Sequence, residues 1–578
     1  MFGCARSASP LYLGVFADDR SRAYDNLFLT VSNYFMCFSD LAPEAGAFVK
    51  YWSKREYNAY LERYVAHFGL GDAIRFDTEV RSAAFDPATR RWIVEASDGS
   101  RRAFDAVVVA TGSNGVPYVP DVAKNFKGLT LHSSEYREPS RFVGLDVVVV
   151  GAGESAADIA SEVCEGGARR CVMWSRRAQL MAPRFPTLMS EDGTHDEFAC
   201  ISDDARARNI ELSDFLEYHT VSRFVNESPL WLFGLVRQLF WRAKMLDTKN
   251  KTFANLCSLA IHGTLEGKAF LPADQAMWIT KNGRAHKFMA EDRLEFLVSP
   301  TATFHEATVT FPAVSYHKRR TFAPPVAVDV ACGAVVFCTG YVTDVPFLAK
   351  DCCERDPRTW YKNCFPAGDL GHSLAFLGWA RPQEGGIPVC AEMLARYHAL
   401  LVAGERRLPE DATAIARSEG RDSARYYYVT PNLKSLVAYN PFMESVAKLI
   451  GCTPRRPSVL SEPCRFLMYW FYPQWSYWYR ERGPGAAPDV LDDVLDRFPL
   501  REKGVFSAEH GVPVPTVLHV LFALFQKPIN FLSLAAATLF PSVAAPGVPA
   551  KGTAYQFNKS KAFILHGEKM KWSNLISP

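Results

Sequence analysis

Long apolar runs are missing from the sequence. Its 578 residues contain no stretch of 18 consecutive apolar side chains, the length at which a segment becomes a candidate for crossing a membrane. The segment that comes nearest to one, residues 516–540, is divided by Gln526, Lys527 and Pro528 into halves of about ten residues, each too short to span roughly 30 Å of hydrocarbon. Two interpretations of this segment stay open: a buried helical hairpin, or an anchor that lies in a membrane surface.

Basic clusters and paired cysteine motifs are also missing. Lys and Arg never occur in runs longer than three, and the formal net charge is +3, whereas proteins that follow a phosphate backbone concentrate basic residues on one face. Nucleic acid is therefore not an expected partner. The 14 cysteines form no CxxC pair, so neither a zinc site nor a short-spaced disulfide framework is predicted.

A secretory signal is not found in the first 20 residues, where no basic region precedes an apolar one. We therefore expect a cytoplasmic protein with reduced thiols. The 48% of hydrophobic residues and 22% of charged residues are ordinary for a globular chain, and the length predicts two to four domains.

The pattern of side chains predicts a mixed α/β chain. Apolar residues at helical spacing indicate an amphipathic helix over residues 44–70. Apolar alternation and buried apolar runs predict strands at 73–80, 91–97, 104–112 and 333–341. We expect mainly helices over residues 184–320 and a packed aromatic outer layer over residues 466–479.

The segment VVVVGAGESAADIASEV, residues 147–163, has the pattern of a dinucleotide-binding turn. Gly151 allows the tight turn from strand to helix, Gly153 leaves room for the pyrophosphate, and the small Ala156 lets the helix approach the sheet. The amides at the start of the helix favour phosphate, helped by the helix dipole. With the strand expected at residues 170–174, the segment completes one βαβ unit of about 30 residues.

The end of the second strand indicates which nicotinamide cofactor binds. An NAD-preferring site carries an acidic residue there, which accepts a hydrogen bond from the ribose 2′-hydroxyl. This sequence instead has Ser175, Arg176 and Arg177, and guanidinium groups bind a 2′-phosphate through charge-assisted hydrogen bonds. NADPH is therefore the predicted cofactor.

A second motif lies just upstream of the fingerprint. In FKGLTLHSSEY, residues 126–136, the side chains of Phe126, Gly128, His132 and Tyr136 match an FxGxxxHxxxY/F pattern. The motif stands between an Ala-Thr-Gly turn and the NADPH fingerprint. On this motif and its position, the chain resembles the flavin-containing monooxygenases, which are class B flavoprotein monooxygenases of the N-oxide-forming dimethylaniline monooxygenase type.

Further segments resemble those of this family, in the same order. Residues 24–40 resemble the segment beside the flavin and the substrate, with Thr30 where many members carry Asn and with Asn33 three residues later. CTGY, residues 338–341, resembles the second glycine turn, and RPQEGGIP, residues 381–388, resembles the late segment near the flavin ring. The resemblance implies catalytic roles for Thr30 and Asn33. Together with the fingerprint it implies cofactor contacts for Gly151, Gly153, Glu154, Ser155, Ala156, Ser175, Arg176, Arg177, Thr111, Gly112, Phe126, Gly128, His132, Tyr136, Thr339, Gly340 and Gln383.

The resemblance also implies an activity and its cofactors. NADPH would reduce FAD, the reduced flavin would take up O₂ as a C4a-hydroperoxide, and an amine nitrogen or a sulfide sulfur of a small molecule would receive one oxygen atom. The protein would hold NADP⁺, exclude water that releases H₂O₂, and orient the substrate. His132 is expected to organise the link between the nucleotide domains rather than to transfer protons.

Two alternatives to this activity stay open. One is a truncated, non-catalytic relative that binds NADPH, and the other is a Baeyer-Villiger or N-hydroxylating monooxygenase. If residues 516–540 form a surface anchor, the chain would lie on the cytosolic face of the endoplasmic reticulum membrane.

One unit that the resemblance implies is not found. Family members begin with a GxGxxG turn for the FAD pyrophosphate, but residues 1–50 contain no GxGxxG. Three explanations stay open: an incomplete gene model, a truncated product without flavin chemistry, or a different means of holding FAD.

The expected fold is α/β, with two Rossmann-like dinucleotide-binding domains and a mostly helical C-terminal extension. The NADPH domain is inserted into an incomplete FAD domain. The expected boundaries are 1–140 for the first part of the FAD domain, 141–330 for the NADPH domain with a helical insertion, 331–450 for the return segment of the FAD domain, and 451–578 for the extension.

Overall fold

The computed structural model describes residues 23–44, 51–177, 181–182, 223, 280–282, 284–318, 320–382, 385–426 and 433–497. Three expectations from the sequence lie outside these residues. They concern the role of Gln383, the choice between hairpin and anchor for residues 516–540, and the GxGxxG unit expected at the start of the fold.

The largest sheet has eight strands and carries the predicted fingerprint. Its order is β12-β13-β11-β8-β7-β15-β6, with β14 paired to β13. Its strands are β6 (Leu129–His132), β7 (Asp146–Val150), β8 (Arg170–Ser175), β11 (Leu294–Val298), β12 (Thr303–Phe304), β13 (Thr308–His317), β14 (Arg320–Ala331) and β15 (Ala334–Phe337). Neighbouring strands pair in parallel from β6 to β11, whereas β13 is antiparallel to β11. The predicted βαβ unit is confirmed as β7, α3 (Glu154–Glu165) and β8.

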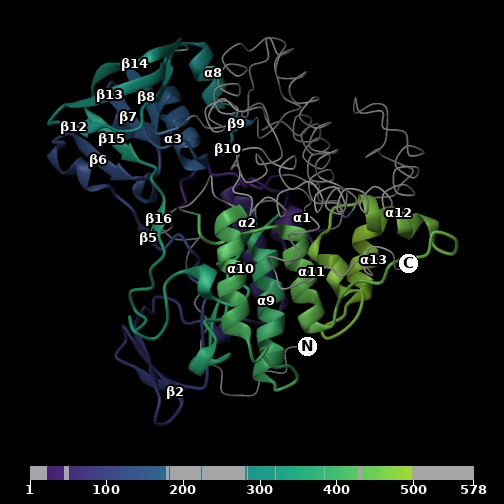
Figure 1. Cartoon of the computed structure of the whole chain (residues 1–578). Helices are drawn as coiled ribbons and strands as arrows, with labels where there is room; N and C mark the ends of the chain where they lie inside the picture. Colours follow the sequence, from purple (N-terminus) through teal and green to yellow (C-terminus); the bar gives the residue numbers. More distant parts are fainter. Residues whose placement is uncertain are drawn as a thin grey trace, which may run out of the picture.

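The central strands of this sheet are apolar throughout because both faces are covered. Val147 and Val149 of β7 pack with α3 and α8 (Arg284–Ala290) in one core cluster. Val148 and Val150 point to the other face, where the side chains of β13 and Phe126 cover them. Figure 1 shows α3 and α8 beside this sheet at one end of the described molecule.

Strands from three of the four expected domains lie in this sheet. β6 precedes residue 140 and β15 follows residue 331, yet both pair within the sheet that contains the fingerprint. The expected domain boundaries stay a prediction. The expectation of helices over residues 184–320 is wrong for the end of that range, because β11, β12 and β13 lie there. Apolar residues alternate along β13, and one face of this strand is buried. This alternation is the sequence pattern from which a strand could have been predicted here.

The remaining strands are short and form separate small sheets. They comprise a meander of β1 (Val80–Asp86), β2 (Arg91–Ala96) and β3 (Arg101–Phe104), a parallel pair of β4 (Val107–Val109) and β17 (Leu374–Phe376), and the small pairs β5 (Val116–Pro117) with β16 (Tyr341–Val342), β9 (Met181–Ala182) with β10 (Thr280–Lys281), and β18 (Arg381–Pro382) with β19 (Leu436–Val437). The strand expected at 91–97 is confirmed. The strand expected at 73–80 is wrong, because β1 begins where that range ends.

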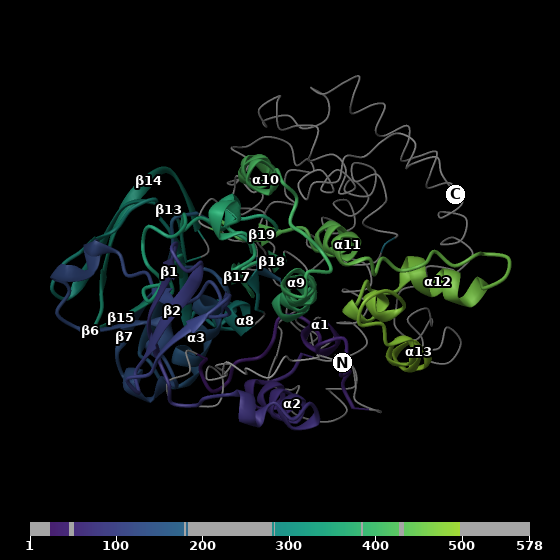
Figure 2. The same cartoon turned by 90° about the horizontal axis from the view of Figure 1, so that it is seen from below.

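Within the described residues, seven further helices form a separate helical part. They are α1 (Asn33–Met36), α2 (Lys54–His67), α9 (Ile387–Val402), α10 (Ala412–Tyr426), α11 (Tyr439–Ile450), α12 (Pro463–Phe471) and α13 (Pro488–Asp496). The predicted helix at 44–70 is confirmed as the shorter α2, which begins at a capping box formed by Ser53 and Glu56. Figure 2 shows α9 between α1 and the strands β17 to β19.

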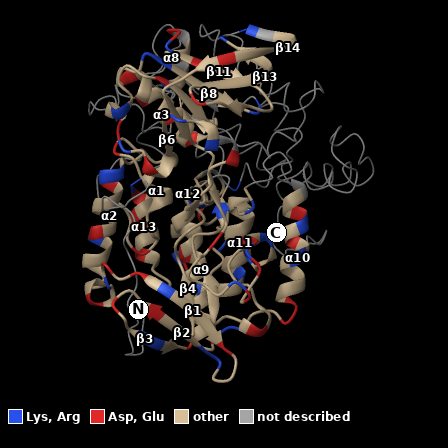
Figure 3. Cartoon of the chain, turned by 90° about the vertical axis from the view of Figure 1, so that its left-hand side faces the viewer, with Lys and Arg blue, Asp and Glu red and all other residues tan. Residues whose placement is uncertain are grey.

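Helix α9 is the centre of the helical part. Its long apolar stripe, which includes Val389, Met393 and Leu394, is fully buried. Figure 3 shows few charged residues on α9 and alternating charges on the outer helix α10. The outer layer expected at 466–479 is wrong for the second half of that segment, because Trp475 and Trp478 are each 1% exposed and belong to the same core as α9. Residues 466–468 are partly exposed.

Candidate functional site

The turn between β7 and α3 has the geometry of a dinucleotide-binding loop. Gly151 has φ of +125°, and a Cβ atom there would lie 2.5 Å from the carbonyl oxygen of Cys338, so only glycine fits. Gly153 is exposed, and a Cβ atom built on it would meet no heavy atom within 4 Å. Ala156 is fully buried against the sheet. The open space therefore lies directly in front of the helix N-terminus, where a diphosphate fits.

The first residues of α3, Glu154 and Ser155, are partly exposed beside this space. Glu154 also approaches the late segment of the chain. Burial lowers the pKa of Arg381, and the negative charge of Glu154 opposes that lowering. The structure thus brings the start of the 381–388 segment close to the fingerprint turn.

The end of β8 lies beside the same turn. The Gly151 amide donates a hydrogen bond to the Trp174 carbonyl over 2.8 Å, so Ser175 follows at the same edge of the sheet. Ser175 is partly exposed, and Arg176 and Arg177 are exposed. Two guanidinium groups are therefore available to solvent at the position where the ribose of a bound dinucleotide ends.

His132 joins two further strand ends to this edge. Its Nδ1 accepts a hydrogen bond from the Ser134 amide over 3.1 Å, so Nε2 carries the proton and donates it to the Gly340 carbonyl over 3.0 Å. The ring is 3% exposed and packs edge-on against Tyr341. With both nitrogens engaged, His132 holds the turn after β15 in place. Its expected role in linking the two nucleotide domains stays a prediction.

Thr339 and Gly340 form that turn after β15. Gly340 has φ of +80°, and the Thr339 hydroxyl donates a hydrogen bond to the Tyr118 carbonyl. The carboxyl ends of β6, β7, β8 and β15 therefore meet at one edge of the sheet, and they bring together ten of the residues predicted to contact a cofactor. These are His132, Gly151, Gly153, Glu154, Ser155, Ser175, Arg176, Arg177, Thr339 and Gly340.

Phe126 and Gly128 lie at the opposite, amino end of β6. Phe126 is buried in the core on the β13 face. A Cβ atom on Gly128 would lie 2.4 Å from the Gly333 carbonyl oxygen, so glycine is needed for close packing there. This placement favours a packing role for both residues over direct cofactor contact.

Tyr136 supports α3 from inside the protein. Its hydroxyl donates a 2.8 Å hydrogen bond to Glu162, and burial raises the pKa of that carboxyl to about 7. Similarly, the Tyr24 hydroxyl donates to Asp158 one turn earlier on α3, and Asn282 donates to the other oxygen of Asp158. Sequence reasoning missed these buried acids. Their spacing of four residues on a helix rich in alanine was the available signal.

The predicted flavin-side turn follows the parallel pair β4 and β17. The Leu377 amide, just after β17, donates a 2.9 Å hydrogen bond to the carbonyl of Val109, the last residue of β4. Gly112 has φ of +68°, and a Cβ atom there would stand 4.0 Å from the Gly378 carbonyl. Thr111 is exposed beside it. Two glycine turns therefore lie at the carboxyl ends of adjacent parallel strands, the side of an open α/β sheet on which nucleotides bind.

The residues expected to be catalytic lie at the start of α1. Thr30 is partly exposed, whereas Asn33 is fully buried and its side-chain oxygen accepts a hydrogen bond from the Tyr34 amide. Helix α1 packs directly on the beginning of α9, because a Cβ atom on Gly386 would lie 2.0 Å from the Phe35 carbonyl oxygen. The structure thus places α1, which begins at Asn33, beside the start of α9. The catalytic roles of Thr30 and Asn33 stay a prediction.

A buried ionic cluster that sequence reasoning missed holds the loop after α1. Arg480 donates to Glu392 of α9 over 2.9 Å and to the hydroxyl of Ser39 over 2.6 Å. Its guanidinium also lies 3.4 Å from Asp40. Glu392 in turn accepts a 2.8 Å hydrogen bond from the Ser39 amide. The cluster joins three parts of the chain that lie far apart in sequence.

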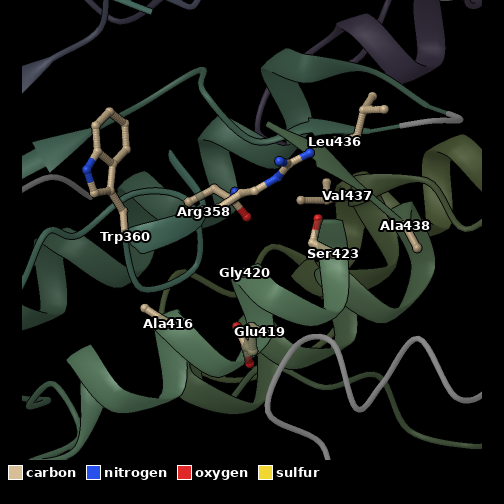
Figure 4. Close-up of a pocket in the computed structure, with 10 residues that line it drawn as sticks. Arg358, Trp360, Ala416, Glu419, Gly420, Ser423, Leu436, Val437 and Ala438 are labelled. Carbon is tan, nitrogen blue, oxygen red and sulfur yellow. The ribbon is translucent and has the colours of Figure 1, made fainter. Parts of the chain in front are cut away.

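A separate small hollow lies between η8 (Pro357–Thr359), α10 and β19, and Figure 4 shows the Arg358 side chain extending across it toward Val437 and Ser423. Burial lowers the pKa of Arg358. None of the predicted site residues lines this hollow, which is lined by Arg358, Trp360, Asn363, Ala416, Glu419, Gly420, Ser423, Leu436, Val437 and Ala438.

Comparison with known proteins gives a family match over most of the chain. The family described as flavin-binding monooxygenase-like matches residues 14–186 and 325–534. A 4-hydroxybenzoate brominase (decarboxylating) from Marinomonas mediterranea is 34% identical over 532 residues, which cover 90% of this chain and 91% of the relative. Flavin-containing monooxygenase 3 of the dog, Canis lupus familiaris, is 24% identical over 89% of this chain and 90% of its own length.

The fold also has a counterpart among solved structures. An open crystal structure of cyclohexanone monooxygenase superposes with a TM-score of 0.51 at 14% identity, covering 77% of this chain and 93% of that protein. The expected α/β class is therefore confirmed. Among the residues that the structure describes, no helix is both long and apolar enough to cross a membrane, and a surface anchor at residues 516–540 stays a prediction.

Proposed function

Because this chain belongs to the flavin-binding monooxygenase-like family, we propose that it uses NADPH, FAD and O₂ to oxidise a halide ion, and that the oxidised halogen then substitutes a phenolic acid. The single observation that carries the choice of substrate is the 34% identity to a decarboxylating 4-hydroxybenzoate brominase along 90% of the chain. The cofactors follow from the family. They are also supported by the two sets of strand ends described above, which belong to β6, β7, β8 and β15 and to β4 and β17.

The chain's own residues account for cofactor binding in this proposal. The α3 amides and the open space at Gly153 hold the NADPH diphosphate, and Arg176 and Arg177 pair with its 2′-phosphate. The turns at Gly112 and Gly378 would lie beside bound FAD. When bound, FAD supplies the chemistry that activates O₂. His132 keeps the turn after β15 aligned with the NADPH edge through its bond to Gly340.

The overall reaction balances with these components alone. NADPH, O₂, one halide ion and two protons give NADP⁺, one hypohalous acid and one water, since the hydride and the halide each give up two electrons and O₂ receives four. The hypohalous acid and a phenolic acid then give the halogenated phenol, CO₂ and one water. Halogen replaces the carboxylate at the ring carbon.

The test is an assay of the full chain with added FAD and NADPH, with 4-hydroxybenzoate as the acceptor, and with bromide, with chloride or without halide. We expect bromide to be required for a product whose mass spectrum shows the paired isotopes of bromine, together with release of CO₂. NADPH consumption without any brominated product, at every bromide concentration, would contradict the proposal.

A second candidate function is oxygenation of an amine nitrogen or a sulfide sulfur. It is favoured by the Phe126, Gly128, His132 and Tyr136 motif, which resembles that of the flavin-containing monooxygenases. The same assay separates the two candidates when N,N-dimethylaniline or a dialkyl sulfide replaces bromide and the phenolic acid. Formation of the N-oxide or sulfoxide, with no bromination, would select this candidate.

A further inference from the structure

A pair of adjacent cysteines lies outside the nucleotide edge. Cys352 and Cys353 follow β16 in a bend, both are partly exposed, and their Sγ atoms are 3.8 Å apart. Among the described cysteines most are buried, and Cys464 is the exposed one. Two thiols within contact distance at the surface are the arrangement that a reversible thiol chemistry needs.

Arg355 is fixed against both sulfurs. Its Nη2 donates to the carbonyl oxygens of Leu348 and Ala349, over 2.8 and 2.9 Å. These bonds direct Nη1 to within 3.2 Å of the Cys353 Sγ and 3.7 Å of the Cys352 Sγ. A guanidinium held by two carbonyls cannot turn away, so a positive charge stays beside the pair.

This environment shifts the pKa values of the two thiols in opposite directions. A hydrogen bond from Cys353 and the Arg355 guanidinium lower the pKa of Cys352 to about 6, against the opposing effects of burial and Asp351. The same sulfur contact, together with burial, raises the pKa of Cys353. By contrast, burial raises the pKa of interior cysteines such as Cys364 and Cys390. The guanidinium fixed beside the two sulfurs therefore favours the thiolate form of one of them.

We propose that Cys352 is a peroxide-reactive thiol and that Cys353 resolves its oxidised form to a disulfide between the two adjacent residues. In the first step the Cys352 sulfur attacks H₂O₂, the O–O bond breaks, and a sulfenic acid and hydroxide form. In the second step the Cys353 sulfur displaces that hydroxyl group as water. Overall, two thiols and one H₂O₂ give one disulfide and two waters, so the thiols are oxidised and the peroxide is reduced.

The oxidant is one that an O₂-using flavoprotein releases when oxygen transfer fails. The product is reversible for a geometric reason. Adjacent Cα atoms lie about 3.8 Å apart, whereas disulfides usually join Cα atoms about 4.4 to 6.8 Å apart, and strained or exposed disulfides are the easily reduced ones. The pair thus records peroxide exposure and returns to the dithiol with a mild thiol reductant.

The test adds H₂O₂ in small excess to the reduced full chain and follows the peptide that contains Cys352 and Cys353 by mass spectrometry. We expect this peptide to lose two hydrogen atoms before Cys464 is oxidised, and dithiothreitol to restore it. Cys464 is the internal control because, among the described cysteines, it is the exposed one. Oxidation of the pair no faster than Cys464, or only to irreversible acids, would overturn the proposal.

Four variants separate the roles of the residues. In Cys353→Ser the sulfenic acid at Cys352 should persist and be captured by dimedone, whereas Cys352→Ser should give no early product. Arg355→Lys, which keeps a cation, should oxidise faster than Arg355→Met. If dimedone captures nothing in Cys353→Ser while that variant stays folded by circular dichroism, Cys352 is not the reactive thiol. These outcomes do not depend on the halide or amine activity.

Discussion

At the scale of single residues, two glycines of one turn have different reasons to be glycine. Gly151 needs a positive φ and lies against the Cys338 carbonyl, so its side chain is excluded by the protein itself. Gly153 has an extended backbone and open space around it, so its side chain is excluded only by what binds there. The sequence pattern alone assigns both to the same fingerprint.

Replacing each glycine with alanine tests this difference. Gly151→Ala should lower the free energy of unfolding by about 1–3 kcal/mol, because it combines strained backbone with a steric clash. Gly153→Ala should change stability by less than about 0.5 kcal/mol yet raise the KM for NADPH. Denaturant unfolding and NADPH-dependent turnover measure the two effects. Equal KM values for Gly153→Ala and the unmodified chain would place the diphosphate elsewhere.

At the scale of elements, α3 is a nucleotide-binding helix with buried acids on its inner side. Glu162 is 3% exposed, and no described side chain bonds its Oε1 atom. Its pKa is raised to about 7 by burial, while the Tyr136 hydroxyl and the Arg284 charge act in the opposite direction. The folded chain therefore keeps a proton on Glu162 at a pH where the unfolded chain has lost it.

This shift predicts a dependence of stability on pH. Between about pH 4.5 and 7 the folded state binds the additional proton, so the free energy of unfolding falls as the pH rises through that window. Glu162→Gln should remove this loss and be more stable than the unmodified chain at pH 8, by about 1–3 kcal/mol, with little difference at pH 4.5. Urea unfolding at the two pH values measures it.

The matched control for this change is Glu95→Gln in β2, where the Glu95 side chain is 51% exposed and its partner Arg101 is also exposed. This change also removes one carboxylate, but an exposed one. If Glu162→Gln gives the same difference from the unmodified chain at both pH values, the proton is not held at Glu162.

At the scale of the whole molecule, the segment after α12 contacts α1 and the loop that follows it. Helix α1 begins at Asn33, one of the residues expected to be catalytic. Arg480 lies 441 positions from Ser39 in sequence and binds it directly. Tyr34, next to Asn33, packs on Trp475 with ring centroids 5.6 Å apart. The position of Asn33 therefore depends on residues more than 400 positions away.

A double-mutant cycle tests how strongly this contact holds the molecule together. Arg480→Met leaves the buried carboxylate of Glu392 without its charge partner and should cost about 3–5 kcal/mol of stability. Arg480→Met combined with Glu392→Gln should recover part of that loss. Tryptophan fluorescence during denaturant unfolding provides the readout, because Trp475 and Trp478 lie in the adjoining core.

Arg455→Met is the control for the loss of a guanidinium, since Arg455 pairs with Glu462 at the surface and exposed ion pairs contribute little. A loss for Arg480→Met no larger than that for Arg455→Met would show that the cluster does not hold the loop.

The sequence by itself determined those elements that depend only on residues close to one another in the chain. The valine run, the glycines at 151 and 153 and the small Ala156 predict β7, the turn and α3, because backbone sterics and burial on both faces of a strand act within a few residues. Arg176 and Arg177 could likewise be identified from their place after the second strand. The capping box at Ser53 and Glu56 marks the start of α2 for the same reason.

Tertiary structure decided what depends on distant partners. Only the sheet order shows that His132 reaches Gly340 across strands and that Phe126 and Gly128 lie at the far edge. Trp475 and Trp478 are interior because they pack in one core with residues of α1, α9 and α11, and nothing within the segment at 466–479 distinguishes an enclosed aromatic ring from a surface one. Parallel strand pairing and buried ion pairs bring together residues hundreds of positions apart, so the candidate site could be predicted residue by residue but not assembled from the sequence alone.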